Sequence, residues 1–571
     1  MYIILFKHMN TSKVLRFFIL ISIVLGSLTL NAQVDTLKLV PPLDIGLVLT
    51  GNFAEPRSAH FHSGIDFKTY TEGKSLHAVA DGYISRINIS PWGYGKAIYI
   101  THNNGFTSVY GHMSTFTDAL KSFVFDLQYQ LNSYAIDTLL PEGLFMVKQG
   151  EIFGYSGNTG FSAGPHLHFE LRETSSEHPV NTLNSVYQLT DNIKPQMSSV
   201  VVYVKDIAQN RVYLEKKLTG GAGIYSGGTI SVNLLSNEAL SFGLEYVDAM
   251  NNTSNKFGVK ELKMFVNNHL YYQSLIEELD FDKQKQKNSF FDFAYYLNNS
   301  RHVHKCFIDP NNDLDFYVAD INRGWFLSDS SGIFPVKIEI VDFNGNVSSL
   351  NFNIDVSITD LRPEISEYLK WDSNYLLLTK NARMELDSGC MFSNDLIDFS
   401  YVGESKFSSK YIASPCDIPL KKPVRVFLLA NDKAAKYEDK LFIACVRNKR
   451  LHYIDAVEEY GYYCATTRVL GTYYIEADTI PPKITSINLS EGGNMSGTNA
   501  INLKISDDLS GISQFNGYIN DTWVLFSYEP KTQIVSYSFD EKLPKDEKLK
   551  LKFIVSDRVG NTSAFERTFI R

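Results

Sequence analysis

The segment GPHLHFEL, residues 164–171, restricts the fold of this chain more strongly than any other stretch. His166 and His168 are two positions apart, and an extended strand is the regular element that directs two such side chains to the same side. The Gly-Pro pair directly before them excludes a helix that runs through the segment. The segment therefore predicts a β-strand with two imidazoles on one face and the apolar side chains of Leu167 and Phe169 on the other.

A second polar segment, HFHSGIDF, lies about a hundred residues earlier and contains His62 and Asp66. Residues four apart share one face of either a helix or a strand, but Gly64 and the β-branched Ile65 between them favour the strand. Together the two segments offer nitrogen and oxygen ligands suited to zinc. A site with three protein ligands leaves the fourth zinc position open for water, which is typical of hydrolytic rather than structural zinc.

Length and composition predict a mainly β protein of several domains. The chain has 571 residues, which is too long for a single core, and 13% of them are aromatic, within many short alternating runs. The formal net charge of -9 provides no basic surface, so nucleic-acid binding is not expected. The five cysteines are scattered and contain no CxxC pair.

The first 32 residues have the pattern of a signal peptide. Lys13 and Arg16 precede the apolar run FFILISIVLGSLTL, and Ala32 offers a small residue at a cleavage site. The run is short for a spanning helix, although an uncleaved anchor remains the alternative. We expect the mature chain to begin near Gln33 and to be exported, to the periplasm or cell envelope or into the medium.

Glycine-punctuated short strands around the histidines predict a compact β domain over residues 33–190. The stretch GKAIYITHNNGFTSVYGHM reads as two strands joined by an Asn-Asn-Gly turn. A longer amphipathic stretch, about 114–144, interrupts this pattern and is interpreted as an inserted lobe beside the site.

Recurring proline-ended segments divide the rest of the chain into immunoglobulin-like β-sandwich modules. DNIKP, DLRP and DTIPP each precede an alternating strand. They predict one or two modules over 195–358, a module over 360–478 and a C-terminal module over 480–571. Segments around Asp342 and Asp557, and a looser one around Asp248, resemble the closing hairpin of such a sandwich. Their Asp and Asn residues are interpreted as turn residues, because the alternating acids and distal glutamate of an EF-hand loop are missing.

Five motifs in order, HSGIDF, ADGYI, VYGHM, GYSGNTG and GPHLHFEL, closely resemble those of the lysostaphin-like (LytM-type) zinc metalloendopeptidases. The resemblance covers about residues 50–182 and implies a compact antiparallel β domain of the duplicated-hybrid-motif type. It also implies that His62, Asp66 and His168 bind zinc and that His112 and His166 are catalytic.

The resemblance implies an enzyme that cuts peptidoglycan. The expected activity is zinc-dependent hydrolysis of peptide bonds in peptidoglycan cross-links, with the wall peptide as substrate. The alternative is a non-enzymatic envelope protein that binds the wall or regulates another hydrolase, with an envelope protein as partner of the β-sandwich modules. A protease for glycine-rich proteins would use the same chemistry. His60 is interpreted as a neighbour of the metal ligands, with a competing ligand as the alternative, and Glu170 and Arg172 as substrate-orienting residues or a surface pair.

Overall fold

The computed structural model describes residues 38–571 except 59, 184–186, 188, 206–209 and 360–367. The expected signal peptide lies outside the described residues. Within them, no helix has both the length and the apolar character needed to cross a membrane. Antiparallel sheets dominate the fold, so the mainly β class is confirmed. Among the described strands, the parallel pairs are β16 (Ile224–Leu235) with β23 (Val347–Thr359) and β35 (Gly493–Asn494) with β42 (Thr562–Ile570).

Two antiparallel sheets build the N-terminal domain. The larger follows the order β1-β2-β11-β6-β5-β4-β8, with β12 paired to β11 and β9 to β4, and the smaller the order β3-β10-β7. Their strands are β1 (Leu49–Gly51), β2 (Ile65–Lys68), β3 (Ser75–His77), β4 (Gly82–Ile89), β5 (Lys96–His102), β6 (Phe106–Gly111), β7 (Thr115–Phe116), β8 (Ile136–Leu139), β9 (Met146–Val147), β10 (Ile152–Tyr155), β11 (His166–Glu173) and β12 (Pro179–Val180).

The stretch interpreted as a lobe contains β7, β8 and the helix α2 (Asp118–Leu131). Leu120 and Val124 on this helix are buried in the core of the domain, and β8 extends the larger sheet beside β4. The segment is therefore part of the domain's own packing.

Residues 195–358 form two sheets around one large apolar cluster. Their strands are β13 (Gln196–Lys205), β14 (Asn210–Lys217), β17 (Ala239–Val247) and β20 (Val303–Lys305) in one sheet, and β15 (Thr219–Gly221), β16 (Ile224–Leu235), β18 (Glu261–Val266), β19 (His269–Leu275), β21 (Tyr317–Asp320), β22 (Gly332–Val341) and β23 (Val347–Thr359) in the other. Short helices lie between β19 and β22: η1 (Gln284–Gln286), α3 (Lys287–Phe290), α4 (Phe293–Asn299) and η2 (Asn322–Gly324). We call this part the first module.

Two further pairs of sheets, each with its own apolar cluster, complete the chain. The second module contains β24 (Tyr375–Thr379), β25 (Ala382–Leu386), β28 (Val424–Leu428), β31 (Val457–Glu459) and β32 (Tyr462–Thr467) in one sheet, and β26 (Asp398–Glu404), β27 (Ser409–Ser414), β29 (Leu441–Arg447), β30 (Arg450–Ile454) and β33 (Thr472–Ala477) in the other, with η3 (Ala435–Lys440). The C-terminal module contains β34 (Lys483–Ser486), β36 (Ala500–Ser506), β39 (Phe526–Glu529) and β40 (Ile534–Ser538), and β35 (Gly493–Asn494), β37 (Ile512–Ile519), β38 (Thr522–Val524), β41 (Lys548–Asp557) and β42 (Thr562–Ile570).

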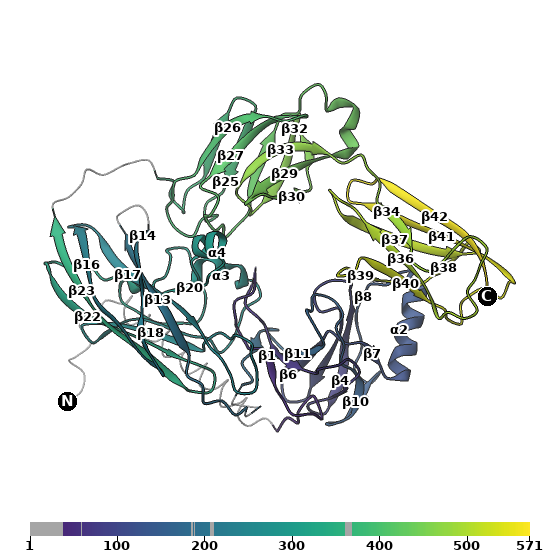
Figure 1. Ribbon diagram of the computed structural model, residues 1–571, viewed down its shortest axis with the longest axis horizontal. Helices are drawn as coiled ribbons and strands as arrows, with labels where there is room; N and C mark the ends of the chain where they lie inside the picture. Colours follow the sequence, from purple (N-terminus) through teal and green to yellow (C-terminus); the bar gives the residue numbers. More distant parts are fainter. Residues whose placement is uncertain (1–37, 59, 184–186, 188, 206–209, 360–367) are drawn as a thin grey trace, which may run out of the picture.

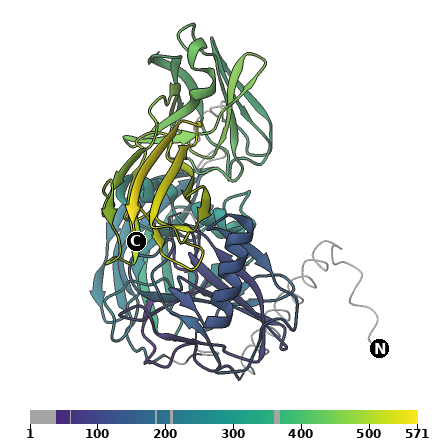
Figure 2. The ribbon, with the colours of Figure 1, turned by 90° about the vertical axis from the view of Figure 1, so that its right-hand side faces the viewer.

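The four parts form a ring, so that the C-terminal module lies beside the N-terminal domain (Figure 1). The second module lies at the opposite end of the molecule from the N-terminal domain (Figure 2). The ring closes where Tyr129 on α2 donates a hydrogen bond to Asp540 Oδ2 at 2.6 Å and packs edge-on against Trp523.

The core of the N-terminal domain continues into the first module. Phe61 packs against Phe290 and Phe316, with ring centroids 5.6 Å apart in both pairs, and Phe53 packs against Phe343. These side chains belong to one buried cluster. Because apolar burial holds the two parts together, the first module provides a fixed support for the loop that precedes β2.

Candidate metal and catalytic site

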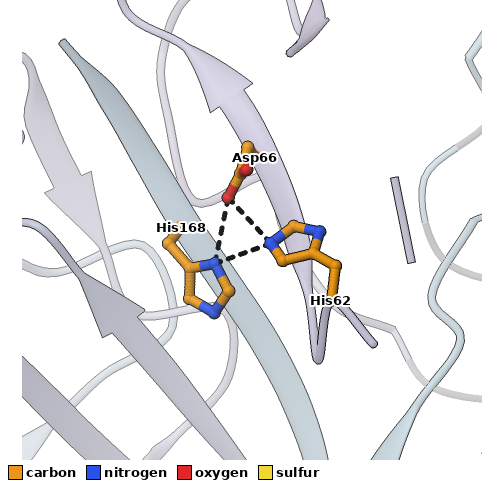
Figure 3. Close-up of side chains that lie close together, drawn as sticks. All are labelled: His62, Asp66 and His168. Carbon is orange, nitrogen blue, oxygen red and sulfur yellow. Dashed lines mark hydrogen bonds and ion pairs between the residues drawn. The ribbon is translucent and has the colours of Figure 1, made fainter. Parts of the chain in front are cut away.

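His62 in the loop before β2, Asp66 on β2 and His168 on β11 lie close together (Figure 3). His168 on β11 stands directly opposite Asp66 on β2 in the antiparallel ladder. Asp66 Oδ1 is 2.9 Å from His168 Nδ1 and 3.1 Å from His62 Nε2, and the two nitrogens are 3.0 Å apart. All three side chains are buried.

The expectation that His62 lies on a strand is wrong. β2 begins at Ile65, and His62 precedes it in a loop held by backbone hydrogen bonds to Ala54 and Glu55. The chain turns at Gly64, where a Cβ atom would lie 2.3 Å from the carbonyl oxygen of Phe169. Because β11 approaches so closely, position 64 requires glycine. β2 therefore does not extend back from Ile65 to His62. By contrast, His166 and His168 do share β11, as their spacing predicts.

The three donors suit a zinc ion. Tetrahedral ligands about 2.0–2.1 Å from zinc lie about 3.3 Å from one another, close to the separations seen here. His62 Nδ1 donates to the carbonyl oxygen of Asn52 at 2.7 Å, so its Nε2 keeps a free lone pair. His168 Nε2 donates to Glu170 Oε1 at 2.7 Å, which leaves Nδ1 free in the same way. Both imidazoles are thus held in the tautomer that a metal needs.

Glu170 is the buried centre of a network behind His168. Its Oε1 accepts hydrogen bonds from Ser63 and Tyr94, each at 2.6 Å, in addition to the one from His168. Its Oε2 accepts one from Arg172 Nε at 2.6 Å. Burial opposes ionisation, but Arg172 and the hydrogen bonds lower the pKa of Glu170, so it is a carboxylate. Both residues are buried, so they do not form a surface pair, and the hydrogen bond from His168 to Glu170 fixes the orientation of the His168 ring.

The two carboxylates determine the protonation of His168 when no metal is bound. Burial opposes a charged ring, but hydrogen bonds to Asp66 and Glu170 raise the pKa of His168 to about 9. Asp66 also has its pKa held well below the usual range, because the neighbouring histidines, His62 above all, outweigh the opposing effect of burial. A metal at this site competes with a proton.

Arg57 is a site residue that the sequence motifs do not reveal. Its Nη2 donates to Asp66 Oδ2 at 2.7 Å, on the side of the carboxylate away from the histidines, and pairs with Glu55 Oε1 at 2.7 Å. The guanidinium keeps one carboxylate oxygen engaged and leaves Oδ1 for the histidine side. His60, three residues later, has an exposed side chain and lies outside the cluster.

His112 and His166 lie beside the cluster with their rings 4.6 Å apart. His112 Nδ1 donates to the carbonyl oxygen of Thr159 at 2.7 Å, and His166 Nδ1 donates to that of Gly164 at 2.8 Å. Both rings therefore keep an unprotonated Nε2. The Nε2 of His166 is 3.5 Å from Asp66 Oδ1. All five residues implied by the family motifs are thus brought together, and their assignment to metal binding or catalysis stays a prediction.

His112 occupies an unusual position. It follows β6 directly with a φ of 60°, a conformation that non-glycine residues adopt rarely and at a cost of about 1–3 kcal/mol. Burial, with the nearby His168 and His166, lowers the pKa of its imidazole to about 3. The ring is consequently neutral near pH 7.

Two modules contact the loops of the site. In the first module, Gly258 exchanges two hydrogen bonds with the side chain of Asn52, at 2.9 and 3.1 Å, and the buried Lys287 donates to the carbonyl oxygen of Arg57 at 2.8 Å. In the C-terminal module, Lys531 donates to the carbonyl oxygens of Asn158 and Ser162, on either side of Thr159. The backbone that positions His62 and His112 is therefore held in part by the modules.

Comparison with known proteins identifies the N-terminal domain. Residues 60–124 match the model of Peptidase family M23, and residues 366–478 match that of a Zu5-like domain. The chain is 35% identical over 123 residues to DD-carboxypeptidase/endopeptidase Mpg of Neisseria meningitidis, which is 22% of each chain. It is 26% identical over 176 residues to peptidoglycan DD-endopeptidase ShyA of Vibrio cholerae, covering 29% of this chain and 34% of the relative.

Among solved structures, the catalytic domain of lysostaphin from Staphylococcus simulans is 27% identical, with 24% of this chain and 80% of that chain covered and a TM-score of 0.16. The match thus spans about a fifth to a third of the curated relatives described above. The resemblance to lysostaphin-like peptidases is confirmed for the N-terminal domain, and the Zu5-like match falls on the second module.

Proposed function

We propose that this chain, through its M23 domain, is an exported zinc-dependent endopeptidase that hydrolyses peptide bonds in peptidoglycan cross-links. The observation that carries the proposal is the arrangement of three metal donors 2.9–3.1 Å apart beside two imidazoles with free Nε2 atoms. The relatives named as peptidoglycan or DD-endopeptidases support the substrate class. The N-terminal signal pattern supports export.

Zinc held by His62, Asp66 and His168 would act as a Lewis acid and lower the pKa of a water molecule toward about 7. His112 is neutral near pH 7, so its Nε2 keeps a lone pair that can accept a hydrogen bond from that water. His166, 4.6 Å from it between ring centroids, can share proton transfer or hydrogen-bond the substrate's developing negative charge. Such a contribution is worth about 10²- to 10³-fold in rate.

Digestion of defined cross-linked muropeptide dimers, with zinc quantified in every sample, tests this function. Wild type is expected to contain zinc and to cleave the dimers. His112→Ala should retain zinc and lose cleavage, whereas His168→Ala should lose both. His269→Ala, which changes an exposed histidine of the first module, is the matched control and should behave as wild type.

The alternative, a non-enzymatic wall-binding or regulatory protein, predicts a different result. Zinc-loaded wild type would then leave the dimers intact and be indistinguishable from His168→Ala. Lys531→Ala, which removes the contact of the C-terminal module with the loop around Thr159, must be assayed in parallel. If this variant also fails to cleave, the enzymatic proposal is wrong.

A further inference from the structure

Three aspartates from distant parts of the chain meet where the N-terminal domain joins the first module. Asp191 lies in the connecting segment, Asp248 directly follows β17, and Asp342 lies in the turn between β22 and β23. Each contributes a carboxylate oxygen, and these oxygens lie within 4.8 Å of one another. Asp248 and Asp342 are only 2% and 1% exposed. Such close, buried like charges repel one another strongly unless a cation or proton compensates them.

The charges of this cluster have no basic partner in the described part of the chain: no lysine, arginine or histidine there forms an ion pair with any of the three. Asp248 Oδ1 is buried and has no hydrogen-bond partner, and the same is true of Asp191 Oδ2. Burial and the charges of Asp342 and Asp191 raise the pKa of Asp248 to about 8. Buried acceptor oxygens without donors, each beside two further carboxylates, favour the binding of a cation.

A residue that contacts the cluster through its backbone also has an unsatisfied oxygen. The backbone N–H of Asn251 donates to Asp191 Oδ1 at 3.3 Å, and the side-chain Oδ1 of Asn251 is buried without a hydrogen-bond partner. Asp342 differs, because its carboxylate accepts hydrogen bonds from Asn344 and Asn346, as expected for a turn residue. The turn interpretation thus accounts for Asp342 but leaves Asp191, Asp248 and Asn251 with unsatisfied oxygens.

The same arrangement recurs at the start of the C-terminal module. Asp478, Asp507 and Asp557 also place carboxylate oxygens within 4.8 Å of one another. Asp478 accepts a hydrogen bond from the residue two positions later, as Asp191 does. Ser510, three residues after Asp507, donates its backbone N–H to Asp478 and keeps a buried Oγ without a partner.

Ser510 corresponds in this pattern to Asn251, which is three residues after Asp248. An unsatisfied side-chain oxygen at equivalent positions of two clusters indicates a common ligand rather than a local packing defect.

We propose that Asp191, Asp248, Asp342 and the side-chain oxygen of Asn251 bind one Ca²⁺ ion. The donors are all oxygens, which calcium prefers and zinc does not. Calcium takes six to eight oxygen ligands at about 2.3–2.6 Å in a flexible geometry, so three carboxylate oxygens that lie within 4.8 Å of one another can share one ion. Magnesium, with shorter bonds and strict octahedral geometry, suits the cluster less well.

Calcium here would stiffen the support of the zinc site. The loop after Asp248 is closed by a bridge to Phe257, and the next residue, Gly258, holds the side chain of Asn52. The carbonyl oxygen of Asn52 in turn accepts the hydrogen bond from His62 Nδ1. One continuous chain of contacts therefore joins the calcium cluster to a zinc ligand.

Equilibrium dialysis of the full chain against Ca²⁺, with zinc measured in the same samples, tests the proposal. Asp248→Asn should bind one Ca²⁺ fewer than wild type at unchanged zinc content. The melting temperature of wild type should rise with Ca²⁺ through this site, and metal-free Asp248→Asn should melt higher than metal-free wild type because the repulsion is reduced. Asp329→Asn, at an exposed position of the first module, should bind as wild type.

Equal Ca²⁺ stoichiometry in wild type and Asp248→Asn would overturn the proposal, as would equally tight binding of Mg²⁺. Asn251→Ala keeps all three carboxylates and is the second test of the calcium site if Asp248→Asn does not fold. It should weaken calcium binding about tenfold, and unchanged affinity in that variant would also count against the site. None of these readouts depends on peptidase activity, so their failure is separate from failure of the proposed function.

Discussion

Replacement of Glu170 by glutamine should expose how strongly the buried network controls the metal site. The carboxylate accepts four hydrogen bonds, from Ser63, Tyr94, His168 and Arg172. A glutamine offers one oxygen and one NH₂ group. The hydroxyl groups of Ser63 and Tyr94 can rotate to accept from NH₂, but the N–H groups of His168 and Arg172 cannot.

Either orientation of the glutamine is therefore unfavourable. If its oxygen faces Arg172, its NH₂ group faces His168 Nε2 and favours the tautomer with the proton on Nδ1, the atom that must bind the metal. If its oxygen faces His168, the NH₂ group opposes Arg172 Nε, which is 2.6 Å from the carboxylate in the native protein. Loss of such a supporting group typically weakens metal binding about 10- to 100-fold, or about 1.4–2.7 kcal/mol.

The metal-free protein should also lose stability, because Arg172 is 6% exposed and loses its charged partner. Breaking a buried ion pair costs about 3–5 kcal/mol. Because the glutamine keeps one hydrogen bond, we expect the free energy of unfolding to fall by about 3 kcal/mol. Zinc affinity is measured by competition with a chromophoric chelator and stability by denaturant unfolding of zinc-free protein. Glu173→Gln, on the same strand with its carboxylate on the surface, is the matched control. A zinc affinity for Glu170→Gln within about threefold of wild type would refute this reasoning.

Three further perturbations address the protonation of His168, the packing near His112 and the contact that closes the ring of domains. Since the pKa of His168 is raised to about 9 against the effect of burial, zinc must displace a proton below that pH, and calorimetric zinc affinity should rise about tenfold per pH unit up to about pH 9. Gly157→Ala would place a Cβ atom 2.7 Å from the carbonyl oxygen of His112, so activity on muropeptides should fall about 100-fold while zinc content is retained. Tyr129→Phe should lower the free energy of unfolding by about 1.5–3 kcal/mol, and a double-mutant cycle with Asp540→Asn should isolate this coupling from the hydrogen bond that Asp540 also accepts from Tyr537.

Local patterns in the sequence already contain several elements of the fold. The Gly-Pro pair and the alternation of HLHF predict β11, and the Asn-Asn-Gly turn correctly predicts the pairing of β5 with β6, where Gly105 has a φ of 86°. The predicted hairpins at Asp342 and Asp557 are confirmed by the pairing of β22 with β23 and of β41 with β42. The looser segment at Asp248 does not form one, because β17 pairs with β13 and β20 instead.

Side-chain periodicity and turn chemistry act between residues a few positions apart, so the sequence by itself determined the strand that carries His166 and His168 and the residue types suited to a metal. Contacts between distant residues are decided by packing. Only the tertiary structure shows that His62 lies in a loop before β2, that Arg57 contacts Asp66 and that Glu170 is buried behind His168. The tertiary structure also brings Asp191, Asp248 and Asp342 together from three separate segments. Their local sequences do not indicate a common site, and their proximity in the fold provides the oxygen ligands that a cation needs.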